Sequence, residues 1–209
     1  IYLLPTNGGQ ALTILTALVF GFELPISPLQ ILWVNIITAV LLSLPIGFEP
    51  AEAGIMDKKP RGHNDPLISR LHLGRIILVS ILMVIGSVLV FKIERGNGIS
   101  LFASQTAAVN AIVMIEIFFL LSMRSLDGWA HKAGLFKNPW IWGGIFATII
   151  VQTGLTYLPL MNSLFKTEAI GTGSWLRIIA VAAVSYFVVE IYKVIGHHFS
   201  VRKKHVPVR

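Results

Sequence analysis

The chain has 209 residues, of which 55% are hydrophobic and only 13% charged, and its mean hydropathy of +0.75 excludes a soluble globular domain. It contains no cysteine, which excludes a disulfide framework and a thiolate metal site. The net charge of +7 is expected where basic segments lie beside an anionic membrane surface, so it requires no nucleic acid partner.

Six segments approach the length of about 20 apolar residues that a helix needs to cross the hydrocarbon core of a bilayer. Their expected bounds are residues 1–20, 29–47, 75–93, 105–124, 139–160 and 174–196. They must be helices, because the bilayer offers the backbone no hydrogen-bond partners and the segments lack the alternation of a membrane β-barrel. The sequence therefore predicts an all-α fold, with residues 1–209 forming one polytopic transmembrane domain.

The first two spans carry polar side chains at a depth where the bilayer makes them costly and therefore informative. In the first span a proline and two glycines surround Asn7 and Gln10, so that backbone carbonyls there can turn toward a cavity lined by protein. Asn7 and Gln10 share one helix face, and Asn35 and Thr38 share a face of the second span. Their oxygens are hard ligands of the kind that alkali and alkaline-earth cations prefer.

The longest connection, residues 48–74, contains three prolines and charges of both signs, which argue against one continuous helix. Connections of this length tend to be functional or disordered. We expect this segment to pack on a neighbouring domain or on helix ends, with a solvated linker as the alternative.

The fourth span places Glu116 well inside its apolar run, and the last span places Glu190 at a similar depth. An intramembrane carboxylate indicates function, so we interpret Glu116 as a candidate cation ligand, with a hydrogen-bonded packing residue as the alternative. Packing is favoured for Glu190, because Lys193 lies one turn away and can pair with it. Asn110 and Gln152 are more typical of hydrogen bonds between helices than of ion ligands.

The basic residues predict the orientation of the chain. An even number of spans places both termini on one side of the membrane. Of the 17 Lys and Arg residues, only Lys92, Arg95, Lys166 and Arg177 fall on the other side or at span ends near it. Under the positive-inside rule, the side of the termini is cytoplasmic. It then holds the 48–74 loop and a basic tail, residues 197–209.

Two long stretches resemble a known family. The run SPLQILWVNIITAVLLSLPIGFEPAEAGIMDKKPR, residues 27–61, resembles the sixth membrane helix and following cytoplasmic loop of P-type cation-pumping ATPases, the group of calcium and sodium/potassium pumps. The stretch YLLPTNGGQALTILTALVFGFELPISP, residues 2–28, resembles the end of the family's fifth helix, and the remainder follows the spacing of helices seven to ten. The resemblance implies that the chain is the carboxy-terminal membrane region, helices five to ten, of a ten-helix transport domain.

The resemblance also implies a cation transport site. In the family, ions bind at mid-membrane among helices four, five, six and eight. Asn7 and Gln10 stand at positions of fifth-helix ligands, Asn35 and Thr38 at positions of sixth-helix ligands, and Glu116 at that of an eighth-helix carboxylate ligand.

Two departures from the family pattern concern the charge of this site. Gln10 replaces a ligand glutamate of the calcium pumps, and Ala39 stands where the sixth helix of calcium and sodium pumps carries an aspartate. A dehydrated divalent cation needs charge compensation, so a two-calcium site is disfavoured and a single or a monovalent ion is favoured.

The chain lacks the family's catalytic signature. The phosphorylated aspartate lies in Asp-Lys-Thr-Gly-Thr, between helices four and five, and this sequence does not occur here. We therefore expect no cofactor in this chain and no ATP hydrolysis by the chain alone, with ATP and Mg²⁺ acting in the full-length pump. Asp57, Lys58, Lys59 and Arg61 are expected to form a coupling loop that contacts the catalytic domain.

Three functions stay open at this point. The chain is the carboxy-terminal part of an ATP-driven cation pump, a truncated pump paralogue acting as a non-enzymatic membrane subunit or regulator, or an independent transporter or channel. The third is disfavoured, because only one mid-membrane carboxylate, Glu116, is a candidate ligand once Glu190 is interpreted as packing, and no inverted repeat is visible. Expected partners are the lipid bilayer, the remaining pump domains (helices one to four and the cytoplasmic domains) and a small inorganic cation. Compact loops are compatible with the plasma membrane of a prokaryote.

The predicted orientation is tested with single cysteines, which are easy to interpret because the chain has none. The charge asymmetry requires the 94–104 loop outside and the 125–138 loop inside. The variant Asn97→Cys should react with an impermeant thiol reagent added to intact cells, and Gly128→Cys should not. The reverse labelling pattern would invert the topology.

Overall fold

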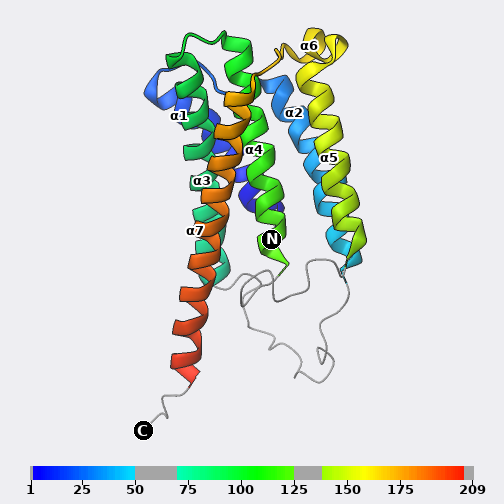
Figure 1. Cartoon of the computed structure of the whole chain (residues 1–209). Helices are drawn as coiled ribbons and strands as arrows, with labels where there is room; N and C mark the ends of the chain where they lie inside the picture. The colour runs from blue at the N-terminus through cyan, green and yellow to red at the C-terminus, as the bar shows by residue number, and fades with distance from the viewer. Residues whose placement is uncertain (1, 50–69, 125–137, 205–209) are drawn as a thin grey trace.

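The computed structural model describes residues 2–49, 70–124 and 138–204, and every regular element within these ranges is a helix (Figure 1). In chain order the elements are α1 (Leu3–Phe20), α2 (Pro28–Ile37), η1 (Thr38–Ser43), η2 (Leu44–Phe48), α3 (Arg70–Gly96), α4 (Leu101–Met123), α5 (Pro139–Tyr157), α6 (Pro159–Phe165) and α7 (Thr172–Lys204). The η1 segment is a π-helix and η2 is a 3₁₀-helix. The predicted all-α fold is confirmed for the described residues.

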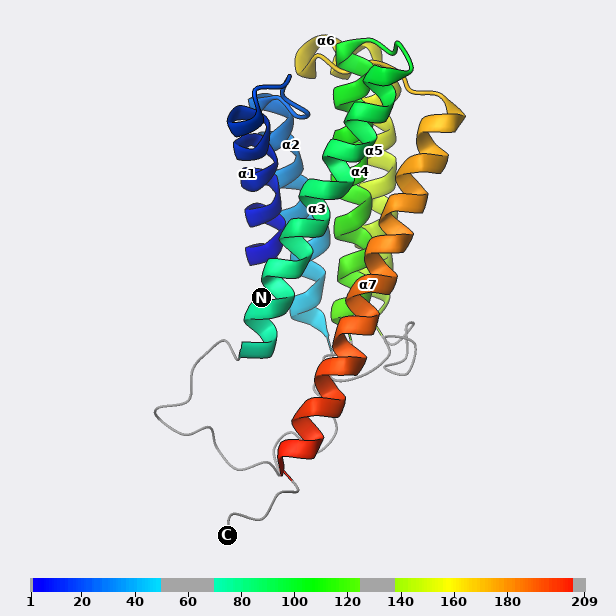
Figure 2. The same ribbon diagram turned by 90° about the vertical axis from the view of Figure 1, so that its left-hand side faces the viewer.

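The long helices lie side by side along roughly one direction, and the short α6 lies across one end of the bundle (Figures 1 and 2). Five helical stretches in the described ranges are long and apolar enough to cross a membrane, and the bent pair α5–α6 makes a sixth if it counts as one span. One of them, Pro28–Phe48, comprises α2, η1 and η2 together. Outward-facing apolar side chains such as Phe146 and Leu176, which are 67% and 70% exposed, suit a surface in contact with lipid tails.

The fifth predicted span, residues 139–160, ends earlier than expected. α5 stops at Tyr157, and Leu158 takes extended backbone angles of φ −80° and ψ 126°. A residue that precedes a proline is kept out of the helical region by the proline ring. Pro159 then begins α6, which is bent by 79° from α5.

α4 is the central helix of the bundle. Within its membrane-spanning window 78% of residues are buried, against at most 39% in the other unbroken spans. It packs along α3 and α7 and also contacts α2, η1 and α5. The buried residues Ala103, Ala107, Ala108 and Ala111 leave room for neighbouring helices to approach closely. A side chain in the middle of α4 is therefore surrounded by several helices.

Polar side chains link the helices, as predicted for Asn110 and Gln152. The Asn110 amide of α4 donates to Thr156 Oγ1 of α5 at 3.0 Å, and Trp33 Nε1 of α2 donates to Gln152 Oε1 of α5 at 3.3 Å. Both bonds attach α5 to the rest of the bundle.

The predicted pairing of Glu190 with Lys193 is also confirmed. The Lys193 ammonium lies 2.6 Å from Glu190 Oε1, and both side chains are buried. Ser122 of α4 joins this pair, because its hydroxyl donates to Glu190 at 2.7 Å and its carbonyl accepts from Lys193 at 2.8 Å. The pair therefore fastens α7 to α4.

The link between α4 and α5 is tested by Thr156→Val in the intact protein. The change keeps the side-chain shape but removes one of the two acceptors of the buried Asn110 amide, the other being the Thr106 carbonyl of its own helix, so we expect a loss of about 0.5–1.5 kcal/mol in unfolding free energy. Thermal unfolding in detergent measures it. Thr153→Val is the matched control, because Thr153 lies on the same helix, is exposed, and bonds only the carbonyl of Ile149. Equal stability of both variants would contradict the assigned role.

Candidate functional site

Glu116 is the centre of a polar cluster built from three segments of the bundle. Its side chain extends from α4 and is fully buried. Oε1 accepts a hydrogen bond of 2.9 Å from the Gln10 amide of α1, and Oε2 accepts one of 2.5 Å from the Thr38 hydroxyl, at the junction of α2 and η1. Within the described part of the chain, no basic side chain forms an ion pair with Glu116. A carboxylate thus lies among neutral polar groups.

Two buried amide oxygens, on the two helices whose side chains bond this carboxylate, have no hydrogen-bond partner among the described residues. Gln10 Oε1 and Asn35 Oδ1 are buried and accept no hydrogen bond from any described residue. Asn35 lies three residues before Thr38, so both side chains share the face of α2 that is turned toward Glu116. A buried polar atom without a hydrogen bond costs about 1–3 kcal/mol, which favours a site where such oxygens meet a ligand.

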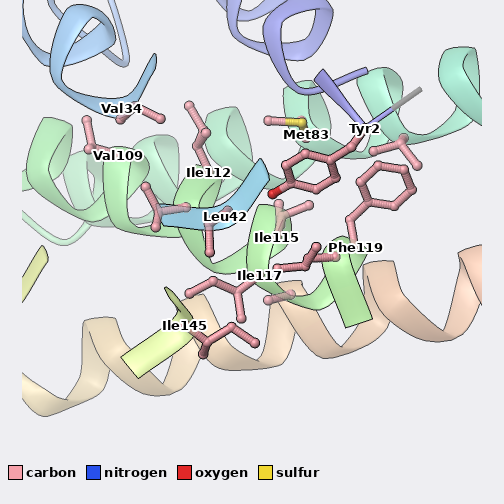
Figure 3. Packing of buried hydrophobic residues seen from close by; sticks show 14 of the residues in the cluster. Tyr2, Val34, Leu42, Met83, Val109, Ile112, Ile115, Ile117, Phe119 and Ile145 are labelled. Carbon is pink, nitrogen blue, oxygen red and sulfur yellow. The ribbon is translucent and has the colours of Figure 1, made fainter. Parts of the chain in front are cut away.

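The surroundings of the cluster are apolar. Tyr2 stacks on Phe119 with ring centroids 5.6 Å apart, and its hydroxyl donates to the backbone carbonyl of Glu116 at 3.1 Å. Met83 of α3 and Ile115 of α4 belong to the same buried hydrophobic cluster (Figure 3). Because such side chains exclude water, interactions of a charge in the cluster are stronger than at a surface.

The five residues predicted as cation ligands are placed in three different ways. Gln10, Thr38 and Glu116 are buried and joined by hydrogen bonds. Asn35 is half-buried, with its oxygen turned inward. Asn7 is exposed and is not brought to the other four in this chain. The expected coupling-loop residues Asp57, Lys58, Lys59 and Arg61 lie outside the described residues.

The irregular backbone beside Thr38 is a feature that the sequence interpretation missed. Thr38 begins the π-helix η1, and the 3₁₀-helix η2 follows directly. The available signal was Pro45, because a proline has no N–H to donate to the carbonyl four residues earlier, that of Leu41. Departures from α-helical geometry of this kind are frequent at functional sites.

In the described residues, no group of three or more His, Asp or Glu side chains is arranged to hold a metal ion. The side chains bonded to Glu116 are an amide and a hydroxyl group.

Comparison with known proteins finds one family over most of the chain. Residues 23–195 match the family described as "Cation transporting ATPase, C-terminus". The probable cation-transporting ATPase F of Mycobacterium tuberculosis is 46% identical over 186 residues, which cover 89% of this chain and 21% of that protein.

Two further relatives extend the match to other bacteria. A cation-transporting ATPase of Synechocystis is 36% identical over 180 residues, which cover 83% of this chain and 20% of the relative. A calcium-transporting ATPase of Bacillus subtilis is 28% identical over 187 residues, with 89% and 21% covered. The chain therefore spans about a fifth of the length of the relatives it matches.

Proposed function

The chain belongs to the cation-transporting ATPase family, as its carboxy-terminal membrane region, and we propose that it supplies cation ligands to the transport site of an ATP-driven P-type pump. With its apolar helices it is an integral multi-pass membrane protein. The proposed ligands are Glu116, Gln10, Thr38 and Asn35. Asn7, the fifth residue expected as a ligand, is exposed and is not part of this cluster in the described residues.

The observation that carries this proposal is the buried carboxylate beside unpaired amide oxygens. Glu116 has two neutral donors, Gln10 and Thr38, and no ion pair in the described residues. An ionised carboxylate away from water is unfavourable unless a counter-charge is near. Gln10 Oε1 and Asn35 Oδ1 are oxygens of the type that bind hard cations. A small inorganic cation supplies the missing charge and gives these oxygens a partner.

The hydrogen bonds to Glu116 stabilise its carboxylate when no cation is bound. A cation that enters must replace the Thr38 and Gln10 donors, because their hydrogens lie on the carboxylate oxygens. Both residues also have oxygens that can serve as ligands once their hydrogens turn away. The site then exchanges hydrogen bonds for ion coordination, which lets it release its cation as well as bind it.

The charge of the site limits the ion. Glu116 is the one carboxylate that the described residues contribute to the cluster. At the two positions where the family has further carboxylates, this chain has the amide Gln10 and the apolar, exposed Ala39. We infer that this chain alone compensates a single positive charge, which favours one ion, or a monovalent ion, over two calcium ions. The calcium specificity in the name of the Bacillus subtilis relative is therefore not transferred to this chain.

The remaining machinery of the pump is proposed to lie outside this chain. Helices one to four and the cytoplasmic domains would bind ATP and Mg²⁺, and the 48–74 loop with Asp57, Lys58, Lys59 and Arg61 would contact them. The orientation follows from the distribution of basic residues, with the termini and this loop in the cytoplasm. The bacterial relatives support a prokaryotic plasma membrane.

The experiment is cation-stimulated ATP hydrolysis by the intact pump carrying Glu116→Gln. Loss of the charged ligand should weaken cation activation by about 1–3 kcal/mol, which is about 5- to 150-fold in the half-activating cation concentration. Asn35→Ala should weaken activation by less, because it removes a neutral ligand.

Glu190→Gln is the control for this experiment. It removes a carboxylate that is equally buried but already paired with Lys193, so the half-activating concentration should stay within about twofold, as expected for residues away from a site. If Glu116→Gln gives the same activation curve as the parent protein, Glu116 is a packing residue and the proposed site is wrong.

A further inference from the structure

Gly144 of α5 makes a backbone contact that no other residue type allows. A Cβ atom added at Gly144 would lie 2.0 Å from the carbonyl oxygen of Leu41 and 3.0 Å from Cγ of Pro45. Real Cβ atoms essentially never approach another atom within 3.0 Å. Gly143, the preceding residue of the same helix, is exposed and would meet nothing within 4 Å. The contact is therefore specific to the face of α5 that is turned toward η1.

The carbonyl that Gly144 contacts belongs to the irregular part of the second span. Pro45 has no N–H, so Leu41 lacks the donor that an α-helix would supply four residues later. The backbone changes there from α-helix through the π-helix η1 to the 3₁₀-helix η2. Thr38, the hydroxyl donor to Glu116, is the first residue of that π-helix.

Two further contacts attach the same segment to α5. Asn138, the N-cap of α5, donates from its amide to the Pro45 carbonyl at 3.2 Å and to Glu49 Oε2 at 2.9 Å. The rings of Phe48 and Trp140 lie with centroids 5.6 Å apart. α5 thus contacts η1 and η2 on the side away from α1, which supplies the Gln10 ligand.

We propose that Gly144 is a positioning residue of the cation site, acting through the η1 backbone to hold the Thr38 hydroxyl beside Glu116, where its oxygen can serve as a cation ligand. α5 carries none of the proposed ligands. Its role in the site is indirect, because it fixes the positions of Leu41 and Pro45. This inference rests on the proposed function, because it assigns a cause to the geometry of that site. A methyl group at Gly144 forces the two backbones apart by about 1 Å or more, the difference between 2.0 Å and the 3.0 Å limit. Such a shift moves the Thr38 oxygen, which lies 2.5 Å from Glu116 Oε2, away from the place where it would serve as a cation ligand beside the carboxylate.

The test compares Gly144→Ala with Gly143→Ala in the intact pump. Misplacing a ligand by about 1 Å can cost up to about 100-fold, and we expect Gly144→Ala to raise the half-activating cation concentration by about tenfold or more. The maximal rate of ATP hydrolysis at saturating cation should fall by a smaller factor. Gly143→Ala adds the same methyl group on the open side of the helix, and should change the half-activating concentration by about twofold or less.

A double-mutant cycle with Thr38→Val distinguishes positioning from general damage. If Gly144 acts through the Thr38 hydroxyl, Gly144→Ala should add about twofold or less to the effect of Thr38→Val, because the ligand oxygen that it misplaces is already absent. Fully additive effects of the two changes on cation activation would overturn the inference.

Asn138→Ser keeps the inference testable if Gly144→Ala does not reach the membrane. A serine retains an oxygen that can cap the Trp140 N–H of α5, now held by Asn138 Oδ1, and removes the amide that holds the Pro45 carbonyl. We expect Asn138→Ser to raise the half-activating cation concentration, as Gly144→Ala does. In the Thr38→Val background, Asn138→Ser should cause no further rise.

The results separate this inference from the proposed function. If Glu116→Gln and Thr38→Val both leave cation activation unchanged, the proposed site is wrong and the positioning role is wrong with it. If they weaken activation while Gly144→Ala and Asn138→Ser do not, the site stands and the positioning role of α5 is wrong.

Discussion

An ionisable carboxylate in the middle of a helix bundle needs its charge balanced, and the position of Glu116 imposes this constraint on the structure. Its helix, α4, is the most deeply buried of the described spans, and small side chains allow its neighbours to approach. The neighbours supply neutral groups: an amide from α1 and a hydroxyl from the end of α2. Two other buried carboxylates of the described residues have their charge balanced within the fold, Glu190 by Lys193 and Glu94 by Arg177. Among the buried carboxylates of the described residues, Glu116 is the one without an ion pair, which is why we propose it as a cation ligand.

The second span combines two requirements that a regular α-helix does not satisfy together. Its first half presents Asn35 and Thr38 on one face, and its second half departs from α-helical geometry at Pro45. Gly144 and Asn138 of α5 contact that second half, so the irregular backbone is supported from outside. The proposed ligands of this span are thus carried by a backbone that a neighbouring helix holds in place, as precise binding sites require.

Much of this arrangement could be predicted from the sequence, because hydropathy and helix periodicity are local properties. The all-α fold, most of the spans and the pairing of Glu190 with Lys193 follow from hydropathy and spacing. The end of α5 at Tyr157 and the π-helix at Thr38 were missed, although Pro159 and Pro45 are the local cause of each. The role of Gly144 could not be predicted from the sequence, because its contact with Leu41 depends on how two helices that are distant in the sequence pack together. The exposure of Asn7 was likewise missed, since spacing gives a shared face but not which neighbour covers it.

The central claim is that Glu116, Gln10, Asn35 and Thr38 coordinate the transported cation. The most direct measurement is a structure of the intact pump, solved with and without the activating cation, at a resolution that shows bound ions. The account predicts a cation density in contact with the Glu116 carboxylate and with Gln10 Oε1 or Asn35 Oδ1, and loss of the Thr38 hydrogen bond to Glu116 in that state. A bound transported cation that contacts none of these side chains, with the Glu116 hydrogen bonds unchanged, would contradict it.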